Sequence, residues 1–317
     1  MGALAAMNLV SLGATAAVSE RAAPRDPAAS VSETTLRTHV QILAGDIGER
    51  NVMNPLALHA AADYLRRQWQ SQGYEVIAHE YTIEHERWAN LEVSRPGRKM
   101  PNEIVVIGAH YDSVFGSPGA NDNGSGVAAL LELSRRFAAR DTERTVRFVA
   151  FVNEEPPFFR TGEMGSRHYA RGARVKGEDI RAMLALETIG YYDDKPGSQN
   201  YPPLFAPFFP DQGNFIGLVS NFRSRTLLKK VVAAFRAASD FPIEHVATFG
   251  WVPGVDWSDH VSFWNEGYPA IMVTDTALYR YPYYHSEQDT PDKVDYARLA
   301  RVTEALAAVV EALAKSD

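Results

Sequence analysis

The sequence predicts an α/β fold in which helices cover both faces of a central, mostly parallel mixed sheet, giving three α/β/α layers. Two observations support this fold class. Apolar runs of strand length alternate along the chain with longer segments whose apolar residues recur every three or four positions. The runs at 103–109 (EIVVIGA) and 145–152 (TVRFVAFV) are almost continuously apolar, which is typical of strands buried on both faces.

Two amphipathic helices are expected first, at 36–43 and 58–69, because each segment gathers its apolar residues on one face. Gly73 follows the second helix and suits the C′ position at which many helices end. Two strands, at 75–83 and 89–94, precede the buried strand described above. The chain therefore enters the sheet through a pair of helices and a pair of strands.

Helices and strands then alternate to the end of the chain, as expected for parallel strands joined by crossover helices. The expected helices are 124–139, a helix starting at 166, 226–238 and 296–314. The expected strands are 145–152, 181–189, 214–219 and 270–274.

The ends of the chain differ in composition from its middle. Residues 1–19 are small and apolar, and Ala14-Thr15-Ala16 resembles a signal-peptidase site, although the first basic residue is Arg21. Residues 20–32 are polar and contain two prolines. We therefore expect a signal-like or flexible segment at 1–32, one domain at 33–317, and a secreted or periplasmic location.

Composition excludes several classes of protein. Apolar residues make up 45% and charged residues 22% of the 317 residues, which is ordinary for a globular protein. The net charge of -7 gives no basic footprint for nucleic acid, and no run approaches the length of a membrane span. With no cysteine, the chain has no disulfides, no thiolate nucleophile and no cysteine-type zinc site. Any metal must be held by His, Asp and Glu.

Side chains that can bind metals follow the predicted strands. In open α/β sheets, ligands bind beyond the carboxyl ends of the strands, so these side chains are expected to meet. In chain order they are His110 and Asp112, Glu154 and Glu155, Glu187, and His285.

Each of these residues also has a simpler interpretation. A single histidine after a strand is usually a satisfied polar group, and Asp122, within 119–126 (GANDNGSG), could cap the helix that follows. Glu154 and Glu155 are harder to explain as solvated, because an apolar strand precedes them and 156–159 (PPFF) follows. Burial there would raise their pKa values unless cations compensate.

Six short motifs occur in order along the chain, and a seventh segment, 289–292 (DTPD), follows them. They are 110–113 (HYDS), 119–126 (GANDNGSG), 153–156 (NEEP), 164–166 (MGS), 258–260 (SDH) and 284–286 (YHS). From about residue 35 to its end, the sequence resembles the co-catalytic zinc aminopeptidase family, which includes bacterial leucine-type aminopeptidases, glutamate carboxypeptidases and glutaminyl cyclases. Each motif alone is weak, but six in order are highly specific.

The resemblance implies a phosphorylase/hydrolase-like zinc exopeptidase fold with two zinc ions per chain. Asp122 would bridge the zincs and Glu154 would be the general base, with Asp112 fixing the His110 tautomer and Asp259 supporting the site. Glu187 departs from the family, since many members carry Asp there. A cis peptide bond is expected between Asp122 and Asn123. The implied metal ligands are His110, Asp122, Glu155, Glu187 and His285.

The implied activity is that of an aminopeptidase, which removes N-terminal residues from peptides with a free N-terminus through a metal-activated water. One alternative is a glutaminyl-cyclase-like acyltransferase with a single zinc. Another is a binding module that has lost its metals, which the retained ligands and base disfavour. No Gly-x-Ser-x-Gly motif supports serine catalysis. His260 and the tyrosine-rich loop at 279–284 are expected to pack rather than to bind substrate.

Overall fold

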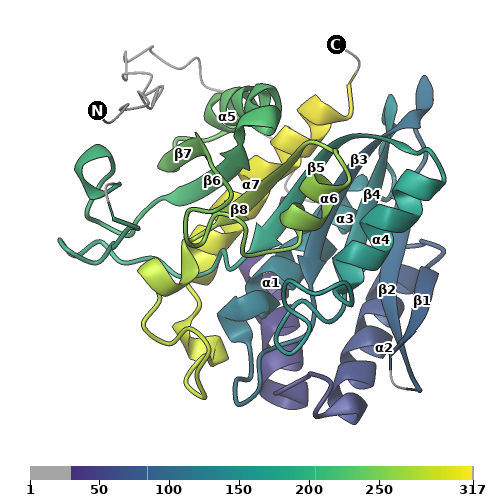
Figure 1. The fold of residues 1–317 in the computed structure, drawn as a ribbon, viewed down its shortest axis with the longest axis horizontal. Coiled ribbons are helices and arrows are strands. Elements are labelled where there is room, and N and C mark those ends of the chain that lie inside the picture. The colour runs from purple at the N-terminus through teal and green to yellow at the C-terminus, as the bar shows by residue number, and fades with distance from the viewer. Residues whose placement is uncertain (1–29, 84, 204, 316–317) are drawn as a thin grey trace, which may run out of the picture.

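A computed structural model describes residues 30–83, 85–203 and 205–315 (Figure 1). The signal-like segment at 1–19 lies outside these residues, as does most of the tether at 20–32. None of the described helices has the length and hydrophobicity that a transmembrane segment requires.

Eight strands form a single sheet in the order β1-β2-β4-β3-β5-β8-β6-β7. The strands are β1 (Ile77–Ile83), β2 (Glu86–Arg95), β3 (Met100–His110), β4 (Arg144–Phe151), β5 (Asp179–Glu187), β6 (Ile216–Asn221), β7 (Ile243–Thr248) and β8 (Ala270–Thr274). The central strands β4, β3, β5 and β8 are parallel, whereas β1, β2 and the β6–β7 pair make the sheet mixed. The predicted fold class is confirmed.

Seven α-helices accompany the sheet in the described chain. They are α1 (Glu33–Val40), α2 (Pro55–Ser71), α3 (Gly126–Phe137), α4 (Gly165–Val175), α5 (Arg225–Ala238), α6 (His260–Asn265) and α7 (Tyr296–Leu313). Gly73, just after α2, has a φ of 85°, the left-handed conformation expected of a helix-ending glycine. A π-helical turn, η2 (Gln41–Ile47), extends α1, and a kinked segment, η3 (Ala120–Ser125), whose residues Asp122 and Asn123 are not helical, precedes α3.

The two faces of the sheet are covered unequally. One face carries the larger core, into which α1, α2, α3, α5 and α7 pack. On the other face, α4 and α6 pack against β3, β4 and β5 in a smaller core, and Figure 1 shows these two helices together on that side of the sheet. The second face of β6, β7 and β8 is therefore left largely to loops.

Two elements differ from the sequence prediction. The strand β7 was not expected, because IEHVAT has no continuous apolar run and four of its six residues are partly exposed at the sheet edge. The helix α6 has six residues, which is too short to show a helical repeat. The other expected helices and strands are present, with ends shifted by a few residues.

Candidate metal centre

The predicted metal-binding side chains gather at one edge of the sheet, where β3, β4 and β5 end. His110 and Glu187 are the last residues of β3 and β5, and Glu154 and Glu155 follow β4 closely. Asp122 lies in η3, and His285 comes from the long loop after β8. All of these side chains except His285 are buried. The loops after separate strands thus converge as the strand-end argument predicted.

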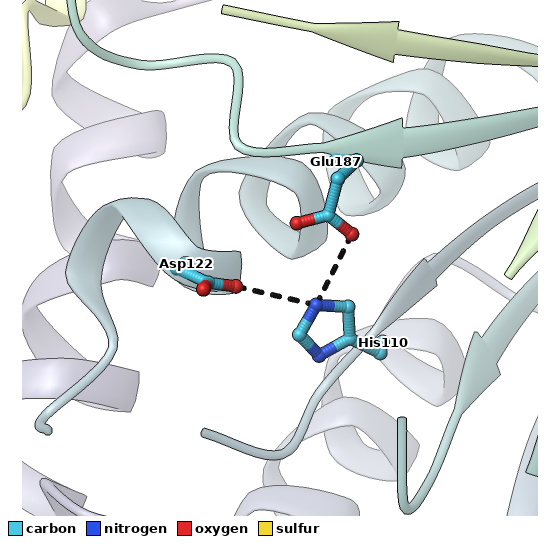
Figure 2. A group of neighbouring side chains, drawn as sticks. All are labelled: His110, Asp122 and Glu187. Atoms are coloured by element: carbon cyan, nitrogen blue, oxygen red, sulfur yellow. Dashed lines mark ion pairs between the residues drawn. The ribbon is translucent and has the colours of Figure 1, made fainter. Parts of the chain in front are cut away.

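Asp122 and His110 form the first group with Glu187, shown in Figure 2. His110 Nε2 lies 3.3 Å from Asp122 Oδ1 and 3.3 Å from Glu187 Oε2. The glutamate lies close to the imidazole although it is one methylene longer than the aspartate that the resemblance implies, so the departure noted in the sequence does not disrupt the group.

The second group uses the other oxygen of Asp122. His285 Nε2 lies 3.1 Å from Asp122 Oδ2 and 3.5 Å from Glu155 Oε2. Each of the two groups offers three ligand atoms within 4.8 Å of one another. A carboxylate shared in this way between two histidine-carboxylate groups has the chemistry of a bridging ligand for two cations.

Several polar atoms of these groups lack hydrogen-bond partners although they are buried. They include both ring nitrogens of His110, Asp122 Oδ1 and Glu155 Oε1. Leaving such atoms unpaired is costly, and a cation bound to imidazole nitrogen and carboxylate oxygen would satisfy them. This donor set of nitrogen and oxygen, without sulfur, fits zinc.

The charges of the cluster support the same interpretation. Burial raises the pKa of Glu155 and Glu154 well above their ordinary values, and neighbouring carboxylates add to the effect. Burial alone would lower the pKa of His110, but the negative charges of Glu187 and of the nearby carboxylates Asp112 and Asp122 raise it instead. The cluster holds more negative than positive charge, and bound cations would neutralise the excess.

Asp112 orients the two adjacent glutamates. Its Oδ1 accepts a hydrogen bond from the Glu154 amide at 3.2 Å, and its Oδ2 accepts one from the Glu155 amide at 3.1 Å. Asn153, just before them, has a φ of 59°, so the chain turns at this point. The turn lets both side chains enter one cleft. The predicted contact with His110 is longer, at 3.5 Å from Nδ1 to Asp112 Oδ1.

Glu154 occupies a different position from Glu155. Its carboxylate joins His110 and Glu155 in a third group, and its Oε2 lies 3.9 Å from His110 Nε2. It belongs to neither group that contains Asp122. Glu154 thus stands beside the two groups, where the resemblance places a general base.

The loop that carries Asp122 is held by a residue for which no role was predicted from the sequence. Asp289 accepts hydrogen bonds from the Asn121 amide at 2.8 Å and from the Asp122 amide at 3.0 Å. Tyr281 donates to the same carboxylate at 2.7 Å. The expected cis peptide bond between Asp122 and Asn123 is present. The segment 289–292 was visible as a motif, but only the structure shows that its first residue positions the shared carboxylate.

Two further supporting residues escaped the sequence prediction. The buried guanidinium of Arg50 donates to the carbonyls of Tyr111, Pro118 and Gly119 at 2.7, 2.6 and 2.9 Å, which fixes the loop leading to η3. Ser258 donates to Glu187 Oε2 at 2.7 Å. Neither residue is a metal-ligand type, so composition gives no signal for them.

Asp259, expected to support the site, lies next to Ser258. It is buried, and burial raises its pKa to about 7. It belongs to none of the three groups, and Ser258 rather than Asp259 makes the hydrogen bond to Glu187. The role of Asp259 stays a prediction.

A pocket adjoins the cluster and extends from Glu187 and Tyr284 over β6, β7 and β8. Together with the open space at its mouth, it encloses about 830 Å³. Aromatic side chains dominate its walls: Tyr201, Phe205, Phe209, Phe215, Trp257, Tyr279 and Tyr284. The loop at 279–284 was expected to pack, but Tyr279 and Tyr284 line this pocket. His260 is buried, and its Nε2 forms a hydrogen bond with the Val255 carbonyl oxygen rather than with the cluster, which is consistent with packing.

Comparison with known sequences places this site in a family context. The family model "Peptidase family M28" matches residues 90–310. The chain is 37% identical over 282 residues to uncharacterized protein YfbL of Escherichia coli K12, covering 86% of each. It is 36% identical over 175 residues to an aminopeptidase of Pseudomonas aeruginosa UCBPP-PA14, covering 50% of this chain but only 28% of that relative.

Solved structures show the same fold. The zinc aminopeptidase BSAP from Bacillus subtilis superposes with a TM-score of 0.73 at 15% identity, over 91% of this chain and 96% of BSAP. Fimbriiglobus ruber glutaminyl cyclase gives a TM-score of 0.68 at 20% identity, over 94% of this chain and 99% of the cyclase. At such identities the likeness establishes the fold alone.

Proposed function

The chain belongs to peptidase family M28, and on that premise we propose that it is a zinc-dependent aminopeptidase that removes residues from the free N-terminus of peptides. The observation that carries the proposal is the pair of histidine-carboxylate groups that share Asp122. The named aminopeptidase relative and the zinc aminopeptidase structure support it.

The residues that would hold the metals follow from the two groups. His110 and Glu187 would bind one zinc, Glu155 and His285 the other, and Asp122 both. Two zinc ions, when bound, would supply a water of lowered pKa and a positive charge that polarises the scissile carbonyl.

Glu154 would move the proton. Its carboxylate is buried beside the two groups, and the Asp112 carboxylate holds its backbone amide. In the reaction, a Glu154 oxygen accepts the proton of the attacking water and then returns a proton to the nitrogen of the leaving amine. This transfer needs a carboxylate that is not itself a metal ligand, and the absence of Glu154 from the two groups that contain Asp122 supports that role.

The geometry also supports attack at the first peptide bond. The pocket runs from Glu187 to the floor formed by β6 and β7, so a substrate side chain entering it brings its own backbone to the cluster. The α-amine of the same residue would then lie against the carboxylates of the cluster. A residue within a longer chain has no such amine, which confines cleavage to the N-terminus.

The second candidate is a single-zinc acyltransferase that cyclises N-terminal glutamine, supported by the likeness to the glutaminyl cyclase structure. The complete second group, with its own histidine, favours two metals and therefore the peptidase. Zinc content separates the two.

The deciding experiment measures zinc and activity together. After zinc reconstitution and desalting, we expect about two zincs per chain by elemental analysis, hydrolysis of aminoacyl-coumarin amides, and loss of turnover after chelation. One zinc per chain, with cyclisation of a glutaminyl peptide and no hydrolysis, would establish the cyclase instead. Full activity without bound metal would exclude both.

A further inference from the structure

The floor of the pocket is formed by one face of three strands. Along β6 and β8, Ile216, Leu218, Ile271 and Val273 enter the larger core, so the alternate residues face the other way. These alternate residues, together with their neighbours on β7, line the pocket: Gly217, Val219, Glu244, Val246, Met272 and Thr274. The alternation places the Glu244 side chain on the pocket side of the sheet.

Glu244 is the acidic member of this floor, and no residue in the described part of the chain neutralises it. It is half-buried, and the described residues form no ion pair or side-chain hydrogen bond with its carboxylate. Burial raises its pKa, and Arg236 acts on it only through space. A carboxylate on a pocket floor without a cation of its own is poised to bind one from outside.

Gly217 leaves room beside this carboxylate. It pairs with Glu244 on β7 and with Thr274 on β8. A Cβ at position 217 would lie 3.2 Å from the Thr274 carbonyl oxygen, which is closer than an ordinary contact. Glycine at this position therefore leaves the floor beside Glu244 without a side chain.

The strand register places Glu244 at a defined distance from the metal cluster. Glu187 pairs with Thr274, which pairs with Gly217, which pairs with Glu244. Three strand spacings of about 4.8 Å give a separation of about 14 Å between the backbones of Glu187 and Glu244. A long side chain is needed to extend from a residue held at the cluster to the carboxylate, and lysine and arginine have such side chains.

The walls suit a cation as well. Tyr201 and Phe209 stack with ring centroids 5.5 Å apart, and Phe209 stacks on Phe205 at 6.3 Å. Aromatic faces pack against the methylene stem of lysine or arginine and attract its charged head. An entirely apolar ligand would instead leave Glu244 desolvated and unpaired.

We propose that this pocket receives the side chain of an N-terminal arginine or lysine and that Glu244 selects for it. The inference rests on the proposed aminopeptidase function, because it assigns the residue removed by that activity. The carboxylate forms a charge-assisted hydrogen bond with the guanidinium or ammonium group, while the aromatic walls enclose the stem.

The test compares coumarin amides of arginine, lysine, citrulline and leucine on the zinc-loaded full chain. Citrulline matches arginine in shape but carries no charge. We expect kcat/KM for arginine and lysine to exceed that for citrulline and leucine by about tenfold or more. Glu244→Gln should remove this advantage and leave kcat/KM for leucine and citrulline within about twofold of the wild-type values. Glu244→Asp should keep part of the advantage. Glu266→Gln, a half-buried glutamate outside the pocket, is the matched control and should change nothing.

Leucine cleaved faster than arginine, with Glu244→Gln altering no substrate, would overturn the inference and leave the aminopeptidase intact. If no amide is cleaved, the proposed function fails. Recognition of the side chain can then be tested by titration calorimetry, which measures binding and does not require turnover. In that measurement Arg-Gly and citrulline-Gly are titrated into the Glu154→Gln protein. Tighter binding of Arg-Gly, lost in the Glu154→Gln/Glu244→Gln double variant, supports the role of Glu244, and equal affinities exclude it.

Discussion

The metal cluster lies where β3, β4 and β5 end and the adjoining pocket lies over one face of β6, β7 and β8, and their residues are distributed differently in the sequence. The cluster takes each side chain from a strand end or from a loop that follows a strand, and its residues are His, Asp and Glu, of which all but Glu187 lie within short motifs. The pocket takes its floor from alternate residues of three strands and its walls from loops around 199–209, 252–257 and 276–284. Chemistry that requires particular residue types leaves motifs that can be recognised in the sequence, whereas the residues that shape the pocket share no such motif.

The largest expected effect separates the two adjacent glutamates of the cluster. Glu154→Gln keeps size and hydrogen bonding but removes the basic oxygen, so kcat should fall about 10²- to 10⁴-fold with zinc content unchanged. Glu155→Gln should instead weaken the second zinc, and added zinc should restore part of its activity. Kinetics and elemental analysis of both variants decide this. Zinc lost from Glu154→Gln but kept by Glu155→Gln would reverse the two roles.

A smaller effect is expected from Asp289, which holds the loop of the cluster without contacting substrate. In Asp289→Asn, an NH₂ group replaces one carboxylate oxygen. This group cannot accept the hydrogen bond that the N–H of Asn121 or Asp122 donates in the wild-type protein, so Asp122 shifts. Metal affinity should fall about 10- to 100-fold, as is usual for residues that orient ligands. Competition with a zinc chelator measures the affinity, and saturating zinc should restore most of the kcat. Asp292→Asn, at an exposed carboxylate three residues later, is the control. Unchanged zinc affinity in Asp289→Asn would show that the loop is held by other contacts.

The sequence predicted the cluster better than the pocket for physical reasons. His110, Glu155 and their partners are recognisable because few other residue types bind zinc. Asp289 and Ser258 support them through hydrogen bonds that many polar residues could make, so sequence alone gives them no distinctive signal. Glu244 was overlooked because it lies on β7, an edge strand without an apolar run, and its meaning depends on pairing with β6.

The pH dependence of zinc stabilisation tests the cluster as a whole. Without metal, Glu154, Glu155 and Glu187 have raised pKa values, and so does Asp259, at about 7. Between their unfolded pKa values near 4 and their raised values, the folded apoprotein binds more protons than the unfolded chain, so its stability falls as pH rises. His110, also raised, acts in the same direction above its unfolded value.

Zinc requires the deprotonated ligands and removes this penalty, so the melting temperature gained on adding zinc should increase between pH 5.5 and 8. Differential scanning calorimetry with and without zinc measures the gain. Taking the difference cancels remote groups such as His39, whose pKa burial lowers to about 4. A gain that is constant with pH, or that shrinks as pH rises, would contradict the proposed ligand set.

The smallest effect belongs to the pocket floor, where Gly217→Ala adds one methyl group beside Glu244. The new Cβ lies 3.2 Å from the Thr274 carbonyl oxygen, closer than ordinary contact, so the floor must shift by a few tenths of an ångström. An N-terminal arginine, which extends to this point, should lose about fivefold in kcat/KM, whereas an N-terminal alanine, which does not, should be cleaved as before. Zinc content should stay the same, because the change lies two strands away from Glu187.

Gly172→Ala is the matched control, since a Cβ there meets no heavy atom within 4 Å. Equal losses for arginine and alanine substrates would mean that the floor supports the cluster itself, and the separation between chemistry and selectivity would then fail.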